Sequence, residues 1–278
     1  MAKKYWGFDV GELDAAIRPQ DDFFHHANKK WMDANPIPKT ESRWGSFTIL
    51  RLETEKQLRA LVEEVSKKES LPEKSAERMV RDFYRSGMDR ERRNALDLSP
   101  LSSLLRAIDA ISDKKSLERT IALLHTQGVG ALWGIDVDQD MKASEKYALY
   151  LGQDGLSLPD RDYYLKDDAE SVRVRDAYKV HVTKIFGLIG SNTEGAKAEC
   201  DTVLRIETRL AKASMKKEDM RDPEKTYHKY TMTSLRKVAP GIDWEAYLTR
   251  MKGSKASYYL VMQPDFFKEV NQMLSEVS

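Results

Sequence analysis

Hydrophobic residues recur at helical spacing along most of the chain. The first clear run has apolar residues at i, i+3, i+4 and i+7 with Glu and Lys between them, which predicts a half-buried surface helix. These residues are Leu58, Leu61, Val62 and Val65. Leu71-Pro72 should end that helix, because proline cannot continue it. The next predicted helix carries one apolar face, made of Ala76, Met79, Val80, Phe83, Tyr84 and Met88.

Capping signals predict where the following helices begin and end. Ser99-Pro100 offers a cap and a first-turn proline. Ser116 predicts the N-cap of a further helix, and Gly128 predicts its end. The second half of the chain shows the same helical spacing of apolar residues. We expect helices at about 171–190 and 194–215, shorter ones from about 233 and 243, and a last one from Pro264. That last helix reaches Ser278 without a glycine cap or a polar tail, which indicates a chain cut from a longer one.

A different pattern interrupts the helices after Val129. ALWGIDVDQD and KYALYLGQDG are short, β-rich segments separated by the polar stretch MKASE. They predict a β-hairpin at about residues 131–151. SYYLVM, near the end of the chain, is expected to be extended and buried. The predicted fold class is therefore mainly α: a multi-helical domain with a small β-hairpin element.

Composition narrows the possible functions. The chain has 278 residues, of which 33% are charged, and its 46 basic and 45 acidic residues leave a formal charge of +1. Nucleic-acid binders usually show a basic excess, so we expect no nucleic-acid partner. Cys200 is the only cysteine, so no internal disulfide is expected. No window is long and apolar enough for a membrane segment. A cytoplasmic protein fits, and so does a periplasmic or secreted one whose signal peptide has been removed.

The residues alone predict no catalytic constellation. The five histidines are His25, His26, His125, His181 and His228, and none is followed by Glu, so the H-E-x-x-H zinc motif is absent. Lone histidines of this kind usually have structural or surface roles. Asp136, Asp138 and Asp140 resemble the start of a calcium loop. Met141 stands where that loop needs glycine, and Tyr147 where it needs its closing Glu. We therefore expect no metal ion to be bound by this chain.

The stretch from Asp21 to Phe47 is unusually aromatic and irregular. Its aromatic residues surround two prolines that interrupt any helix, and such residues bury large areas when they dock. We expect residues 1–52 to form an irregular aromatic segment that packs against a partner surface. Residues 53–278 should form a mainly helical region, truncated at its C-terminal end.

Two stretches together resemble the neprilysin and oligopeptidase O family of zinc endopeptidases. They are DDFFHHANKKWMDANPIPKTESRWGSF, with the helix that follows it, and GLSLPDRDYYL. KKEDMRDPEKTYHKYTMTSLRKVAPGIDW matches the family's next segment in style and order. The resemblance runs from about Trp6 to the end of the chain. With a single cysteine, the chain resembles the bacterial branch rather than the disulfide-rich animal members.

The resemblance implies a function that this chain performs only in part. Family members hydrolyse oligopeptides with a zinc ion whose ligands lie in a C-terminal half that this sequence lacks. The chain thus resembles the N-terminal region, which helps to enclose the cavity, and alone it should be inactive. In Ser42-Arg43-Trp44-Gly45, the resemblance implies that Arg43 binds the C-terminal carboxylate of the substrate. A structural arginine paired with a nearby acid is the alternative role for that residue.

Two other interpretations remain open at this point. The chain could be a non-catalytic helical binding or scaffold module derived from the same family. It could also assemble non-covalently with a separate C-terminal fragment. The reading frame after Ser278 separates the peptidase from the module, because only a peptidase needs H-E-x-x-H downstream.

Overall fold

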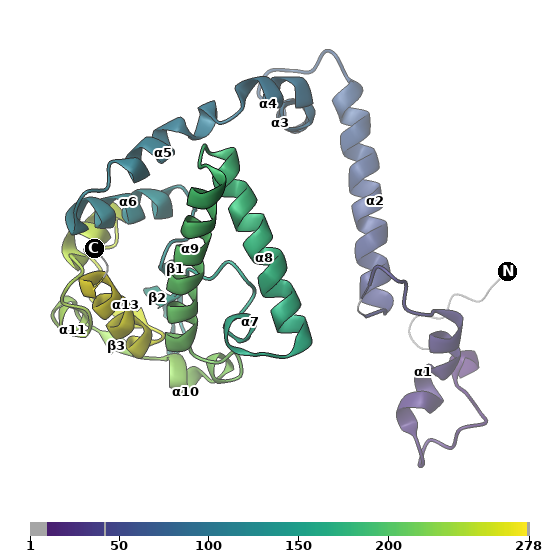
Figure 1. Cartoon of the computed structure of the whole chain (residues 1–278). Coiled ribbons are helices and arrows are strands. Elements are labelled where there is room, and N and C mark those ends of the chain that lie inside the picture. Colours follow the sequence, from purple (N-terminus) through teal and green to yellow (C-terminus); the bar gives the residue numbers. More distant parts are fainter. Residues whose placement is uncertain (1–9, 42, 277–278) are drawn as a thin grey trace. The chain divides into compact units, whose positions relative to one another are not determined.

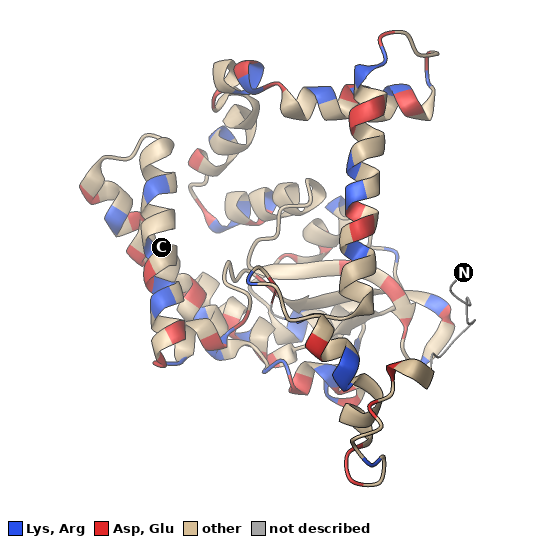
Figure 2. Ribbon diagram, turned by 90° about the vertical axis from the view of Figure 1, so that its right-hand side faces the viewer, with Lys and Arg blue, Asp and Glu red and all other residues tan. Residues whose placement is uncertain are grey.

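The protein divides into two compact units, Met1–Ala95 and Leu96–Ser278 (Figure 1). The structure is a computed structural model that describes residues 10–41 and 43–276. It is mainly helical with one small sheet, which confirms the predicted fold class. Basic and acidic positions are interspersed along the helices, in keeping with the near-neutral net charge (Figure 2). Within the described ranges, no helix has the length and apolar character needed to cross a bilayer.

The described residues of the first unit form helices, turns and loops, with no strand among them. Its elements are a 3-10 turn at Val10–Glu12, α1 (Phe23–Ala34), α2 (Ser46–Lys67), α3 (Ala76–Met88) and α4 (Arg90–Leu96), which ends one residue into the second unit. Helix α2 runs continuously through position 52, where we expected the irregular segment to end. It stops four residues before Leu71-Pro72, and α3 begins after the N-cap Ser75, whose side chain accepts a hydrogen bond from the Arg78 backbone.

The apolar faces predicted for these two helices are not covered. Leu58 and Leu61 on α2 are each 55% exposed, and Phe83 on α3 is 83% exposed. Among the described residues of this unit, only Val65 and Arg81 are buried. Within this unit, the half-buried face predicted for α2 is therefore found only in part, at Val62 and Val65. Helical spacing identifies the face that a helix will bury, but it does not supply the surface that buries it.

The second unit contains helices around a four-stranded sheet. Its helices are α5 (Ser102–Asp109), α6 (Lys114–Thr126), α7 (Asp162–Leu165), α8 (Ala169–Leu188), α9 (Thr193–Ala213), α10 (Pro223–Thr226), α11 (Met232–Val238), α12 (Trp244–Arg250) and α13 (Pro264–Glu276). Two 3-10 turns lie at Ser99–Leu101 and Asp219–Arg221. The strands are β1 (Trp133–Asp140), β2 (Ala143–Gln153), β3 (Lys229–Tyr230) and β4 (Tyr259–Val261).

The sheet has the strand order β1-β2-β4-β3. Strands β1 and β2 form the predicted antiparallel hairpin, although β2 already begins within the MKASE stretch that we expected to separate them. The predicted extended segment SYYLVM supplies β4, which pairs parallel to β2 and antiparallel to β3. Hydrophobic patterning gave no sign of this pairing, because strands of two or three residues carry too little periodicity.

Residues 148–151 of strand β2 are buried on both faces of the sheet. Leu149 and Leu151 belong to the main core, whereas Ala148 and Tyr150 join Leu260 in a smaller cluster. Alternate residues of a strand point to opposite faces, so this division follows from the pleat. The main core is centred on interlocking aromatic rings. The ring pairs include Trp133–Trp244, Trp133–Tyr247, Trp244–Phe267 and Phe266–Phe267, with centroids between 5.3 and 5.9 Å apart.

Two capping predictions differ from the structure in detail. Asp113, not Ser116, is the N-cap residue of α6, and Ser116 completes a capping box three positions later. Its side-chain oxygen accepts the backbone N–H of Asp113, so the hydroxyl does act at this helix end. Ser99-Pro100 opens a 3-10 turn before α5 rather than the α-helix itself. Gly128 follows α6 with φ +74, as a helix-ending glycine should.

A buried carboxylate ties the end of β1 to two distant segments. Asp140 is fully buried and accepts hydrogen bonds from the hydroxyls of Tyr258 (2.7 Å) and Tyr227 (2.9 Å). The Lys229 ammonium lies 3.7 Å from the centre of the Tyr258 ring. The hydrogen bond to Asp140, followed by burial, raises the pKa of Tyr258 to about 12. The folded state therefore favours the neutral phenol.

This network predicts a loss of stability in alkali. The ordinary tyrosine pKa is 10.0, so the unfolded chain releases the Tyr258 proton first and stability falls as the pH rises from 10.0 to about 12. Tyr258→Phe should reduce the fall over that window, although the variant should be less stable near neutral pH because Asp140 loses a donor. Urea unfolding at several pH values measures both effects. Tyr147→Phe, at a position that is 72% exposed, is the control. An unchanged pH profile in Tyr258→Phe contradicts this role.

Candidate functional site

Arg43 lies just before the long helix α2, two residues ahead of its N-cap Gly45. The side chain is exposed, and it makes no hydrogen bond or ion pair with residues 10–41 or 44–276. Ser42 is its neighbour in the first family signature, Asp21–Phe47, and lies outside the described residues. Glu41 is the nearest acid in the sequence, but its carboxylate lies 3.5 Å from Arg51, which also pairs with Glu55 at 2.7 Å. Arg43 therefore has no acidic partner among the described residues.

The start of α2 adds to the positive character of this position. The first N–H groups of a helix have no partner within the helix, and the helix dipole places a partial positive charge there. Gly45 supplies no side-chain cap, and the first turn contains no acidic residue. Phe47, in the same turn, is 89% exposed. An arginine two residues before an uncapped helix start suits a carboxylate, and the exposed Phe47 ring in the first turn offers an apolar surface.

The two adjacent histidines hold local structure. His25 Nδ1 lies 2.6 Å from a carboxylate oxygen of Asp22, which is also the N-cap residue of α1. His26 Nδ1 lies 2.7 Å from the Ile17 carbonyl oxygen and 3.0 Å from that of Asp14. The two rings thus serve different parts of the backbone and do not converge on a common point.

The other histidines also give no metal site. His125 Nδ1 lies 2.7 Å from the Tyr247 hydroxyl, and its Nε2 lies 3.0 Å from the Ala131 carbonyl oxygen. Burial lowers the pKa of His125, which favours the neutral ring. His228 Nδ1 faces the Val261 carbonyl oxygen at 3.2 Å. Across the described chain, no three His, Cys, Asp or Glu side chains are grouped so that they could hold a metal ion. These residues do not fit a catalytic zinc.

The second signature, GLSLPDRDYYL, is anchored by a residue that we did not single out in the sequence. Glu207 on α9 is buried and accepts hydrogen bonds from Ser157 (2.6 Å), Tyr164 (3.0 Å) and Tyr178 (3.0 Å). Tyr164 also accepts the backbone N–H of Leu158 at 2.9 Å. Burial raises the pKa of Tyr178 to about 12, so its hydroxyl keeps the proton that it donates. One carboxylate therefore fixes the path of the signature loop.

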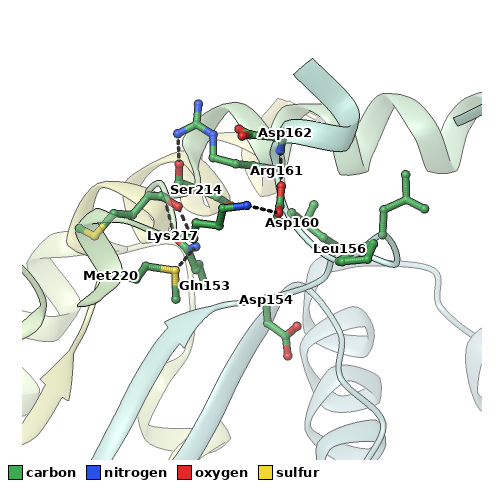
Figure 3. Close-up of a pocket in the computed structure, with 12 residues that line it drawn as sticks. Gln153, Asp154, Leu156, Asp160, Arg161, Asp162, Ser214, Lys217 and Met220 are labelled. Atoms are coloured by element: carbon green, nitrogen blue, oxygen red, sulfur yellow. Dashed lines mark hydrogen bonds and ion pairs between the residues drawn. The ribbon is translucent and has the colours of Figure 1, made fainter. Parts of the chain in front are cut away.

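That loop forms one wall of a cavity of about 370 Å³ (Figure 3). The charged groups in the cavity wall are largely satisfied by its own residues. Lys217 lies 3.3 Å from the Asp160 carboxylate, and the Arg161 guanidinium donates to the Ser214 carbonyl oxygen. The Gln153 side chain pairs with the backbone N–H and carbonyl of Met215, at 2.6 and 3.2 Å. These hydrogen bonds and this ion pair connect residues of the cavity wall to one another. They join the signature loop to the segment after α9.

Known proteins show what these two signatures belong to. The family model described as peptidase family M13 matches residues 19–278. The chain belongs to peptidase family M13. It is 30% identical to neprilysin-3 of Drosophila melanogaster over 94% of its own length, and 31% identical to an endothelin-converting enzyme homolog of Locusta migratoria, again over 94%. The family predicted from the sequence is confirmed.

A solved structure extends this likeness to the fold. The crystal structure of the Mycobacterium tuberculosis zinc metalloprotease Zmp1, in complex with an inhibitor, matches 98% of the chain with a TM-score of 0.82 at 30% identity. The match covers 41% of the Zmp1 chain. This chain likewise spans only 35% and 38% of the lengths of the two curated relatives. The family contains zinc metallopeptidases, and the present chain corresponds to the N-terminal family region.

The Glu207 network predicts a specific cost for Glu207→Gln. The amide keeps one acceptor oxygen but turns an NH₂ group toward hydroxyls that now donate to the carboxylate. Leaving buried polar groups unsatisfied should lower the free energy of unfolding by about 1–3 kcal/mol. Urea denaturation followed by circular dichroism measures the change. Glu199→Gln, at an exposed position on the same helix, is the control and should unfold like the wild type. Equal stability of both variants argues against an anchoring role.

Proposed function

We propose that this chain is the N-terminal region of a zinc metalloendopeptidase that hydrolyses oligopeptides. In this proposal it helps to enclose the substrate cavity, and Arg43 binds the C-terminal carboxylate of the peptide. Family membership supports the activity class. The observation that carries the residue assignment is the exposed guanidinium of Arg43, without a described acidic partner, beside the uncapped start of α2.

The chemistry of Arg43 suits this role. A guanidinium presents a planar fork of N–H donors that matches both oxygens of a carboxylate, and it stays charged when partly desolvated. The positive end of α2 adds to its attraction for the anion. When Arg43 holds the C-terminal carboxylate, it fixes the position of that end of the peptide, and the rest of the peptide extends from there. Arg43 thus acts as a positioning residue for the substrate.

The zinc ion and its ligands belong, in this proposal, to a catalytic half that follows in the same polypeptide. The aromatic segment 1–52 packs against that half. Its described part exposes the apolar side chains of Phe23 (70%), Phe24 (60%) and Ile37 (59%), which such a contact would cover.

The role of Arg43 can be tested in the full-length protein. Arg43→Ala should lower kcat/KM for peptides with a free C-terminal carboxylate by about 10- to 100-fold, because a hydrogen bond to a charged group contributes about 1.5–3 kcal/mol. Peptides with an amidated C-terminus should be affected much less. Arg59→Ala removes another exposed arginine, farther along α2, and should leave the cleavage of both kinds of substrate unchanged. Equal losses on free and amidated peptides refute the assignment.

The isolated 278-residue chain should not cleave peptides. It should show no turnover above background with or without added zinc, because its described residues offer no group of zinc ligands. The full-length protein, assayed on the same peptides, should show turnover that a chelator abolishes. Chelator-sensitive cleavage by the short chain contradicts the proposal. A full-length protein without any peptidase activity favours a binding or scaffold module instead.

A further inference from the structure

Strand β1 forms one edge of the four-stranded sheet. Among the described residues it pairs with β2 alone, apart from a single bridge at its first residue. The strands of this hairpin both belong to the second unit, so the geometry of the edge is internal to that unit. An edge strand presents a row of backbone N–H and C=O groups with which another strand can pair, and proteins therefore protect such edges.

The register of the hairpin decides which backbone groups of β1 point to the free edge. In an antiparallel pair, residues alternate between those whose N–H and C=O groups both face the partner strand and those whose groups both face away. The Leu151 carbonyl oxygen accepts the backbone N–H of Met262, just after β4, so it points away from β1. Leu151 is paired with Ile135. Ile135, Val137 and Gln139 therefore turn their N–H and C=O groups toward the free edge.

Two aspartates accept hydrogen bonds from donors on this edge. Asp136 Oδ1 accepts the backbone N–H of Val137 at 2.8 Å, and Asp138 Oδ1 accepts that of Gln139 at 2.7 Å. Each carboxylate thus bonds to the residue that follows it. Ile135 lies where the strand enters the core and is only partly exposed. The two N–H groups on the exposed part of the edge are therefore already bonded, with a negative charge beside each.

The third aspartate of this D-x-D-x-D stretch serves the hairpin turn. Asp140 Oδ1 accepts the backbone N–H of Lys142 at 2.9 Å, in addition to the two tyrosine hydroxyls described above. All three carboxylates therefore accept hydrogen bonds from the chain itself. The alternation that resembles a calcium loop matches the two-residue period of the strand, which places Asp136 and Asp138 on one face of the sheet.

Without these aspartates, the edge would suit a second copy of the same strand. Val137 is 62% exposed and Tyr147 is 72% exposed. Gln139 is paired with Tyr147 and lies two residues from Val137, so both apolar side chains stand on one face beside the edge. Two β1 strands related by a twofold axis could pair antiparallel, because such an interface uses the same surface on both copies.

We propose that Asp136 and Asp138, by accepting the N–H groups of Val137 and Gln139, prevent β1 from pairing with β1 of a second copy of this chain. The side chains occupy the donors that an added strand needs. Their charges also oppose pairing, because the carboxylates of two copies would be brought together. This role goes beyond the proposed function and needs neither zinc nor a peptide.

Sedimentation of the 278-residue chain over a wide range of concentrations tests the proposal. Asp136→Val with Asp138→Val should strengthen self-association by about tenfold or more, because valine frees both donors and favours strands. Asp167→Val with Asp176→Val is the control, since it removes two exposed carboxylates elsewhere in the second unit. A β1 variant that associates no more strongly than this control overturns the proposal.

A second variant separates the hydrogen bonds from the charge. Asp136→Asn with Asp138→Asn keeps a side-chain oxygen that can accept the same N–H groups. This variant should remain close to the wild type in its association. Asparagine and valine variants that associate equally strongly refute the role of the hydrogen bonds, because charge alone would then explain the effect.

Hydrogen exchange locates the contact. In the valine variant, amides of residues 133–140 should exchange more slowly at high than at low protein concentration, because pairing between copies protects them. Association that leaves the exchange of these residues unchanged uses another surface and overturns the proposal. Both substituted positions are exposed, so the circular dichroism of the dilute variants should match that of the wild type, which shows that they fold.

Discussion

The second unit depends on a strand whose residues 148–151 are buried on both faces. Because β2 buries Leu149 and Leu151 on one side and Ala148 and Tyr150 on the other, both of its faces need partners. The aromatic core around Trp133 and Trp244 covers one face, and the cluster with Leu260 covers the other. Strand β4 occupies the free edge of β2 through parallel pairing. Segments from both ends of this unit are thereby brought to one strand, which gives it a single cooperative core.

The first unit is held together by different interactions. Its helices are held by backbone carbonyls, arginine side chains and local ion pairs, of which exposed examples contribute little stability. Its hydrophobic residues face outward, from Phe23 in α1 to Phe83 in α3. The two units therefore differ in where their stabilisation comes from. The second is stabilised by its own core, whereas the first presents the residues that a core would need.

Much of the fold could be predicted from the sequence because its signals are local. Apolar spacing, Pro264 and Gly128 predict where helices run, begin and end, and the alternating segments around Val137 predict the hairpin. The role of Asp113 as a cap was missed, because Ser116 takes part in the same capping box and is an equally good signal. The exposure of Phe83 could not be predicted, because periodicity does not say whether a covering surface exists.

The site was harder to predict from residues alone. Arg43 was singled out by resemblance, since a lone arginine in a charged chain carries no chemical signature. Its lack of a described acidic partner is a property of three-dimensional structure. Glu207 was missed for a related reason. It is one of many acids on a charged helix, and its three hydroxyl partners lie 29, 43 and 50 residues away in the sequence.

The arginine contacts between α2 and α3 have a consequence for conformational entropy. Arg81 and Arg85 fix the angle between the two helices through bonds to backbone carbonyls, which form without help from any apolar surface. These bonds therefore restrict the conformations open to the turn between the two helices. A preorganised surface loses less conformational entropy on association, so more of the apolar contact appears as net affinity. Polar bonds thus limit the conformations of this helix pair, although many of its apolar side chains are exposed.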